Sequence, residues 1–204
     1  MSSTDASGMF DLSVDPRLAY AAAAPFKKVL QIGSGWARFK GDEIEFVNSD
    51  RKPGPGVDRI FDVTGKWEAQ DGEFDLVLAF HILEHIPIEK IVDVLKEAKR
   101  VLRPSGVLLI EVPDLKGLCE EYLKGNVGLV ECIYGHDRYD GDQHRWGYTG
   151  PDLVALLHVA GFSRTVVGPA KCYHRLQLPA LRIEATHYGE NNWANRVPLE
   201  TSDG

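Results

Sequence analysis

Residues 29–32, together with the Gly33, Ser34 and Gly35 turn that follows them, constrain the fold more than any other part of the chain. The run Val-Leu-Gln-Ile is mostly aliphatic and too short for a helix, so it is predicted to be a buried β-strand. A Gly-x-Gly turn at the carboxyl end of a strand lets the backbone approach a ligand closely, and a helix that follows would direct its free N–H groups there. The stretch therefore predicts a nucleotide site in an α/β protein, with a tight turn that binds no ligand as the alternative.

The next predicted strand supplies a carboxylate at the same edge of the sheet. Residues 44–47 are predicted to form this strand, and the chain then reaches Asp50. In doubly wound sheets such a carboxylate accepts both hydroxyls of a ribose, because neighbouring parallel strands end at one edge. The full dinucleotide fingerprint needs a third glycine where this chain has Arg38. Since a pyrophosphate needs that glycine for close approach, the sequence disfavours a nicotinamide or flavin dinucleotide.

The middle of the chain reads as a strand, a helix and a second strand. Residues 74–80 are an almost continuous apolar run, typical of a central strand. Apolar residues then recur at helical spacing from Ile88 to Leu102, with Pro87 near the first turn. Residues 103–106 are predicted to form a turn before a buried strand at 107–112. This is the βαβ unit of a parallel sheet.

Residues 115–148 are predicted to cover the site. Helical segments are expected at 115–122 and 127–134. The loop at 135–147 is too polar for a core and too aromatic for an ordinary surface loop, so it is the predicted lid. Pro151 is then expected to open a helix that Gly161 ends. Strands are expected at 165–167 and 181–185.

Composition limits the organisation and the partners. A chain of 204 residues is long enough for one well-buried domain, which we place at 25–190, after a lead-in with a short helix at 1–24 and before a mobile tail at 191–204. The net charge of −7 argues against a nucleic acid partner. Three cysteines at no metal-ligand spacing suggest a reducing compartment. With no signal sequence and no run of about 20 apolar residues, we expect a cytoplasmic protein without a membrane partner.

With these motifs in this order, the chain resembles the class I S-adenosylmethionine-dependent methyltransferases from about residue 29 to about residue 186. The motifs that carry the resemblance are the Gly33-Ser34-Gly35 turn, Asp50, Phe74-Asp75-Leu76-Val77, His81-Ile82-Leu83-Glu84-His85 and Leu102-Arg103-Pro104-Ser105-Gly106. The last two are the most specific. The resemblance implies an α/β, doubly wound sheet of seven mostly parallel strands with one antiparallel strand near its edge. It also implies S-adenosyl-L-methionine as the methyl donor and S-adenosyl-L-homocysteine as the product.

The resemblance further implies which residues contact the cofactor. They are Gln31, Gly33, Ser34, Gly35, Asp50, Asp62, Phe80 and His81. The glycine turn would lie against the amino-acid part of the cofactor, and Gln31 stands where many members have an acid. Asp50 would bind the ribose and Asp62 would approach the adenine. Phe80 and His81, at the end of their strand, would border the methionine portion.

Two histidines are the candidate catalytic residues. Methyl transfer from a sulfonium is an in-line displacement, so an enzyme must align the reactants and, for a hydroxyl acceptor, remove a proton. A histidine suits this task because its unperturbed pKa is about 6.5. We take His144 as the first candidate base and His85 as the second, and for both the alternative is a purely structural role in ordering a loop.

The segment that follows His144 is similar to the acceptor-facing segment of several small-molecule methyltransferase groups. The resemblance implies that Arg145, Trp146 and Tyr148 bind the substrate, with an oxygen or nitrogen of a small molecule as the acceptor. A homodimer is left open as the assembly.

Two other readings of the chain remain open. His81-Ile82-Leu83-Glu84-His85 matches the His-x-x-Glu-His pattern of zinc peptidases. That chemistry requires both histidines on one face of a helix, whereas Pro87 two residues later disfavours a continuous helix here. The chain could also be a non-catalytic binding subunit with a methyltransferase-like fold, because Gln31 and Ala37 depart from the usual motif.

We assign no metal ligand. The alternative is a divalent cation held by Asp140, Asp142, His144 and His136 in the predicted lid.

Overall fold

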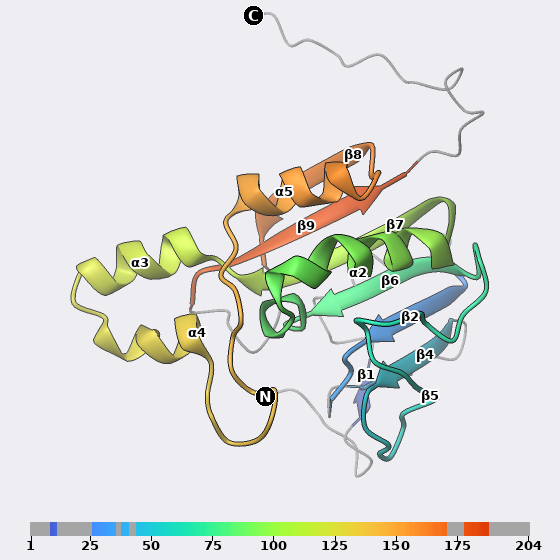
Figure 1. Ribbon diagram of the computed structural model, residues 1–204, viewed down its shortest axis with the longest axis horizontal. Helices are drawn as coiled ribbons and strands as arrows, with labels where there is room; N and C mark the ends of the chain where they lie inside the picture. The colour runs from blue at the N-terminus through green and yellow to red at the C-terminus, as the bar shows by residue number, and fades with distance from the viewer. Residues whose placement is uncertain (1–8, 12–25, 36–37, 41–43, 171–177, 188–204) are drawn as a thin grey trace, which may run out of the picture.

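The computed structural model describes residues 9–11, 26–35, 38–40, 44–170 and 178–187. Most of the predicted lead-in, its short helix, Ala37 and the predicted tail lie outside these residues. A seven-stranded sheet runs through the described part (Figure 1), in the order β5-β4-β2-β6-β7-β9-β8. Its strands are β2 (Lys28–Ile32), β4 (Glu45–Asp50), β5 (Arg59–Ile60), β6 (Phe74–Phe80), β7 (Leu102–Pro113), β8 (Arg164–Pro169) and β9 (Ala180–Thr186). Only β9 runs antiparallel to its neighbours within this sheet, which confirms the predicted strand arrangement.

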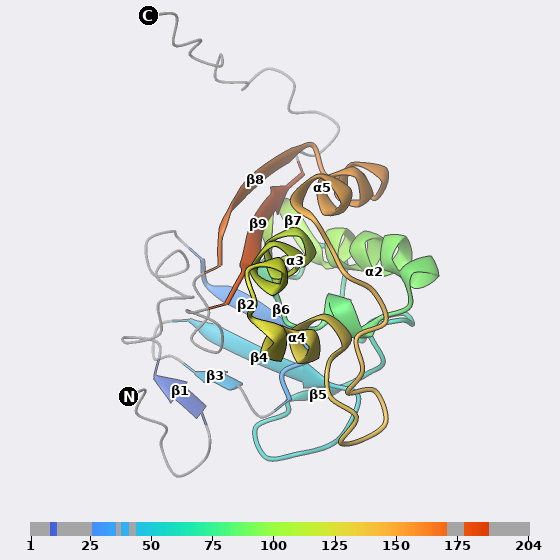
Figure 2. The same cartoon turned by 90° about the vertical axis from the view of Figure 1, so that its left-hand side faces the viewer.

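Helices cover one face and one end of the sheet. They are η2 (Leu83–His85), α2 (Ile88–Val101), α3 (Leu115–Leu123), η3 (Val127–Leu129), α4 (Val130–Tyr134) and α5 (Gly150–Val159). Figures 1 and 2 show α2 and α5 side by side on one face, while α3 and α4 project beyond the carboxyl end of β6. No helix of the described residues is both long and apolar enough to cross a membrane.

The larger core lies between the sheet and the helices α2 and α5. The amphipathic pattern of α2 buries Ile91, Val94, Leu95, Ala98 and Val101 against the sheet. Leu153 and Leu157 of α5, with Ala160 directly after it, join the same core. Each fully buried aliphatic side chain contributes about 1.5–3 kcal/mol relative to an exposed one. This packing anchors the carboxyl ends of the central strands, where the candidate site lies.

The glycine turn is followed by a strand, and the helix expected there is absent from the described residues. β3 (Arg38–Lys40) pairs in parallel with β1 (Met9–Asp11) in a separate two-stranded sheet. The Phe39 N–H donates to Asn48 Oδ1, and Asn48 Nδ2 donates to the Phe39 carbonyl, both at 2.9 Å. Phe39 is fully buried and packs against Phe80 and Phe46. The Phe39 ring is buried on the second face of the sheet, and this burial favours the strand conformation over the expected helix.

The turn predicted at 103–106 is part of β7. This strand begins at Leu102, directly after α2, and its register against β6 shifts between Phe74 and Leu76. Ser105 has a φ of +66°, a value that a non-glycine residue rarely adopts. The irregular segment therefore lies within the strand and does not precede it.

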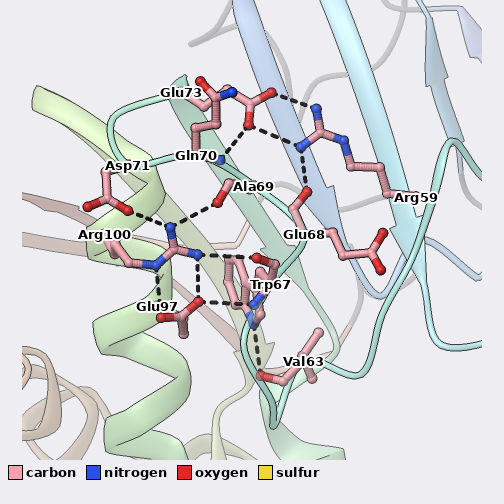
Figure 3. Close-up of polar contacts among 10 residues, drawn as sticks. All are labelled: Arg59, Val63, Trp67, Glu68, Ala69, Gln70, Asp71, Glu73, Glu97 and Arg100. Atoms are coloured by element: carbon pink, nitrogen blue, oxygen red, sulfur yellow. Dashed lines mark hydrogen bonds and ion pairs between the residues drawn. The ribbon is translucent and has the colours of Figure 1, made fainter.

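The connection between β5 and β6 contains no helix and is held by charged side chains (Figure 3). Arg59 makes two hydrogen bonds to Glu73, at 2.6 and 3.1 Å, and its hydrogen bond is the main reason that the pKa of Glu73 falls to about 2. Arg100 of α2 donates to Glu97 and Asp71. This network fixes the loop whose first residues line the candidate site.

Candidate cofactor and acceptor site

A cleft of about 930 Å³ lies at the carboxyl ends of the parallel strands. This is the edge where ligands bind in open α/β sheets, and the volume is that of a small-molecule site. The loops after β2, β4, β5 and β6 form one side of the cleft, while α4 and residues 135–145 form the other. Figure 2 shows α3, α4 and the segment after them in front of the carboxyl ends of the strands.

The glycine turn forms a cradle at one end of the cleft. Gly33 and Gly35 have φ values of +59° and +53°, which favour glycine. A Cβ at Gly33 would lie 2.5 Å from Cδ1 of Ile82, so this position also lacks room for a side chain. Ser34 is buried, and within the described residues its Oγ has no hydrogen-bond partner. The turn thus offers a ligand close backbone approach and one unused hydroxyl.

Asp50 lines the cleft beside this turn, as predicted from its place at the end of β4. Its Oδ2 accepts the N–H of Gly35 at 2.8 Å, and its Oδ1 accepts the N–H of Lys52 at 3.0 Å. Each carboxylate oxygen has two lone pairs, so both can still accept a hydroxyl from a ligand. The two backbone bonds hold the carboxylate in place for that contact.

Three further predicted cofactor residues, Asp62, Phe80 and His81, also line the cleft. Asp62 accepts hydrogen bonds from the N–H and the hydroxyl of Thr64, both at 2.8 Å, and these bonds lower the pKa of Asp62. His81 has a φ of +50°, and its N–H donates to the Glu111 carbonyl. A non-glycine residue held in this conformation at the end of a strand is typical of functional sites.

Gln31 and two of the predicted substrate residues are not brought to the cleft. Gln31 is buried within β2, and it does not line the cleft. Tyr148 is fully buried in the main core, where its hydroxyl donates to the Leu83 carbonyl and burial raises its pKa. Trp146 lies beside a small adjoining cavity, whereas Arg145 does line the cleft. Tyr148 therefore supports the site from behind and does not face it.

The two candidate catalytic histidines lie together. Their rings meet edge to face with centroids 4.8 Å apart, and both residues line the cleft. His85 is the last residue of η2, just after β6, while His144 belongs to the predicted lid. The lid is fastened to this turn because the N–H groups of Arg145 and Trp146 both donate to the carbonyl of Glu84, at 2.6 and 3.2 Å.

The hydrogen bonds of the two histidines define their tautomers. The Nδ1 atom of His85 lies 3.2 Å from the Gln143 carbonyl, and that of His144 lies 3.2 Å from the Ile133 carbonyl. Because a carbonyl only accepts, each Nδ1 carries the proton and each Nε2 carries a lone pair in the neutral ring. Burial lowers the pKa of His144, which keeps it neutral near pH 7. The site therefore holds two adjacent imidazoles, of which that of His144 is neutral near pH 7.

Glu84 is a cleft residue that the sequence reasoning did not select as a site residue. Its side chain is only 2% exposed, and its Oε1 lies 3.2 Å from His81 Nδ1. Burial acts to raise its pKa, but the hydrogen bond from His81 and the nearby imidazoles outweigh this effect, so the pKa lies below its ordinary value. The Leu83-Glu84-His85 motif could have pointed to this residue. It places a glutamate between a buried strand and a helix, and glutamate is rarely buried in proteins unless it is paired.

The lid is tied to the loop that follows Asp50. Arg51 donates to the Asp140 carbonyl, and Lys52 lies over the Tyr139 ring, 5.6 Å from its centroid. Asp142 is buried and is bound by Arg138 through two side-chain bonds, at 2.8 and 3.0 Å. Among the described residues, Asp140, Asp142, His136 and His144 do not come together as a group of metal ligands, which the alternative required.

The peptidase pattern does not form the helix that its chemistry needs. Only Leu83–His85 is helical, as a single 3₁₀ turn, and His81 has a left-handed backbone. Because the helical turn begins after His81, the two histidines of the pattern do not lie on one helical face.

The family model described as "Methyltransferase domain" matches residues 12–166, which is most of the chain. The chain belongs to this methyltransferase family. The predictions of a class I S-adenosylmethionine-dependent methyltransferase, of its fold and of its cofactor are therefore confirmed.

Solved structures agree on the fold. A SAM-dependent methyltransferase from Archaeoglobus fulgidus has a TM-score of 0.58 at 16% identity, over 86% of this chain and 94% of that one. A possible histamine N-methyltransferase from Thermotoga maritima has a TM-score of 0.55 at 18% identity, over 85% and 88% of the two chains. The 1,6-didemethyltoxoflavin-N1-methyltransferase of Burkholderia thailandensis, solved with 1,6-didemethyltoxoflavin and S-adenosylhomocysteine, has a TM-score of 0.56 at 17% identity, over 84% and 75%. No curated protein matches the sequence.

Proposed function

We propose that this methyltransferase transfers the methyl group of S-adenosylmethionine to an oxygen or nitrogen of a small-molecule acceptor. One observation carries the proposal. A single cleft joins the glycine turn and Asp50 at one end to the paired imidazoles of His85 and His144 at the other. The first group suits the cofactor and the second suits removal of an acceptor proton.

The residues at the cofactor end fit a nucleoside with an amino-acid arm. Asp50 offers free lone pairs to the ribose hydroxyls, and Asp62 lies along the same edge to receive the adenine amino group. The amino-acid arm would lie against Gly33 and Gly35, where the buried Ser34 hydroxyl can bond to it. When bound, the cofactor supplies a methyl group on a positively charged sulfur.

The acceptor end of the cleft has groups that can orient an acceptor and hold a proton. Nε2 of His144 or His85 can accept a proton from a hydroxyl, because both Nδ1 atoms are already engaged. Arg145, whose N–H fixes the lid to Glu84, also lines this end. The lid and α4 bound the cleft on the far side. An acceptor bound at this end would lie beside the cofactor, as in-line transfer requires.

Size and charge favour a small acceptor. The net charge of −7 disfavours a nucleic acid, and the cleft is bounded by α4 and by the fastened lid. The structurally similar enzyme from Burkholderia thailandensis was solved with 1,6-didemethyltoxoflavin, which is consistent with a small-molecule role for a fold of this kind.

Calorimetry with S-adenosylhomocysteine tests the cofactor end. We expect micromolar binding that Asp50→Ala weakens at least tenfold, about 1.4 kcal/mol. The matched control is Asp93→Ala, which removes an exposed aspartate of α2 and is expected to leave the affinity unchanged. Equal affinity in all three proteins would contradict the placement of the ribose at Asp50.

Transfer of a labelled methyl group tests the acceptor. The protein is incubated with methyl-labelled S-adenosylmethionine and a cell extract, which is then separated into small molecules, protein and nucleic acid. We expect label in the small-molecule fraction. Label in a macromolecular fraction would overturn the acceptor class, while cofactor binding with no transfer to any fraction would favour the non-catalytic binding subunit.

A further inference from the structure

Three potential metal ligands lie close together at the acceptor end of the cleft. One ligand atom each of Glu84, His85 and His144 lies within 4.8 Å of the other two. We propose that these three residues bind a divalent cation of the Zn²⁺ class. Two nitrogens and one carboxylate oxygen are a common zinc ligand set, and three protein ligands leave a further position open for a water or a substrate.

The histidines are already prepared as ligands. A metal-binding histidine almost always donates its other ring N–H to a carbonyl, a carboxylate or a water, which fixes the ring and its tautomer. Here His85 does so to the Gln143 carbonyl and His144 to the Ile133 carbonyl. Each Nε2 therefore presents its lone pair without any change of tautomer.

Glu84 supplies an independent sign of a missing partner. Its side chain is 2% exposed, and its Oε2 makes no hydrogen bond within the described part of the chain, while Oε1 is engaged by His81. Leaving a buried carboxylate oxygen without a partner costs about 1–3 kcal/mol or more. A cation bound to Oε2 would remove this cost, and His81 would then act as the outer residue that orients the carboxylate.

The three ligand atoms must move slightly closer together to bind one cation. In a tetrahedral site with bonds of about 2.0–2.2 Å, neighbouring ligand atoms are roughly 3.3–3.6 Å apart. The ligand atoms that lie within 4.8 Å of one another must therefore approach by at most about 1.5 Å, which side-chain rotations can supply. The N–H groups of Arg145 and Trp146 already hold the lid against the turn that carries Glu84.

The donor set also selects the class of cation. Imidazole nitrogens suit Zn²⁺ and its neighbours among the transition metals, whereas Mg²⁺ and Ca²⁺ prefer oxygen ligands. The acidic pair that could have supplied such oxygens, Asp140 and Asp142, is engaged by arginines. We therefore expect Zn²⁺ to bind and Mg²⁺ to bind far more weakly.

A bound cation would give the site a chemical role that rests on the proposed function. An acceptor hydroxyl at the open position would have its pKa lowered, and its proton would pass to solvent. The resulting oxyanion would attack the methyl carbon as the carbon–sulfur bond breaks and its electron pair stays on sulfur, which yields S-adenosylhomocysteine and a methyl ether. The histidines would then act as ligands, and the cation would replace them as the group that activates the hydroxyl.

The test is a titration of chelator-treated full-length protein with Zn²⁺ in a calorimeter. We expect one site of micromolar affinity or better, weakened at least tenfold by Glu84→Gln, by His85→Asn and by His144→Asn. The control His158→Asn removes an exposed histidine of α5 and should change the affinity less than twofold. The same titration with Mg²⁺ should show binding at least tenfold weaker than that of Zn²⁺.

Absence of a one-to-one Zn²⁺ site in the wild type, or equal affinity in the three variants and the control, would overturn the proposal. So would Mg²⁺ binding as tight as that of Zn²⁺. The Co²⁺ derivative adds a second readout, because an intense thiolate charge-transfer band would place the cation at a cysteine such as Cys132, which also lines the cleft.

Calorimetry with S-adenosylhomocysteine on the same samples separates the two proposals. Wild-type protein that binds the nucleoside but not Zn²⁺ overturns the metal site alone. Protein that binds Zn²⁺ but not the nucleoside overturns the proposed cofactor site alone. Near-ultraviolet circular dichroism spectra check that each variant is folded. Weaker binding by a folded variant is then due to the loss of the metal ligand.

Discussion

The imidazole rings of His85 and His144 meet edge to face, with their centroids 4.8 Å apart. One ring comes from the turn after β6 and the other from the loop between α4 and α5. Each ring donates its Nδ1 proton to a backbone carbonyl. This shared arrangement links the lid to the end of the central strand and gives the acceptor end of the cleft its chemistry.

We predict that His144→Gln lowers the rate of methyl transfer by at least about 100-fold, the usual contribution of a positioned acid or base. Glutamine has no titratable nitrogen, whereas the cofactor end of the cleft is untouched. The affinity for S-adenosylhomocysteine should therefore change less than twofold. Single-turnover kinetics with the identified acceptor measure the first effect and calorimetry the second. A rate within threefold of the wild type would remove His144 from the chemistry.

Gly33→Ala should weaken cofactor binding and destabilise the fold. The residue has a φ of +59°, and an added Cβ would lie 2.5 Å from Ile82 Cδ1. The left-handed conformation alone costs alanine about 1–2 kcal/mol. The control is Gly128→Ala in η3, where a Cβ meets nothing within 4 Å and the φ is not positive. Urea unfolding compares the two variants, and equal stability would show that the turn tolerates a side chain.

The buried pair of Glu111 and Arg182 is predicted to be sensitive to the loss of one partner. The two side chains are 0% and 4% exposed, and they lie 3.2 Å apart between β7 and β9. Removing the guanidinium by Arg182→Met leaves a buried carboxylate without this cation, which typically costs about 3–5 kcal/mol. The double variant Glu111→Leu with Arg182→Met should recover most of that loss, because it removes both charges. Denaturant unfolding of the single and double variants measures the difference.

The pairing of Glu73 with Arg59 predicts a pH dependence of stability. Hydrogen bonds, the strongest of them from Arg59, lower the pKa of Glu73 from 4.5 to about 2 in the folded protein. A lowered folded-state pKa gives stability that is complete above pH 4.5 and is lost as the pH falls through about 2. The stability gap between the wild type and Glu73→Gln should thus shrink by roughly 1 kcal/mol from pH 6 to pH 3.5. Urea unfolding at both pH values checks this, and a constant gap would rule it out.

The strands of the central sheet could be predicted from the sequence, and so could the meeting of Gly33 and Asp50 at one edge of it. Strands β2, β6 and β7 and helix α2 follow from local patterns, because a buried strand needs a continuous apolar run and an amphipathic helix needs apolar residues at helical spacing. Gly33 and Asp50 could be placed for the same reason. Both stand at the carboxyl ends of neighbouring parallel strands, so adjacency in the sheet brings them together.

The segments around the central strands depend on contacts that form only in the folded chain. Phe39 is buried against Phe80 and bonded to Asn48, so a strand forms where the local pattern allowed a helix. Tyr148 turns into the core, although its segment was predicted to face the substrate. The meeting of Glu84, His85 and His144 depends on hydrogen bonds between the lid and a distant turn. Such long-range contacts leave no periodic signal in the sequence, because they are set by which segments the folded chain brings side by side.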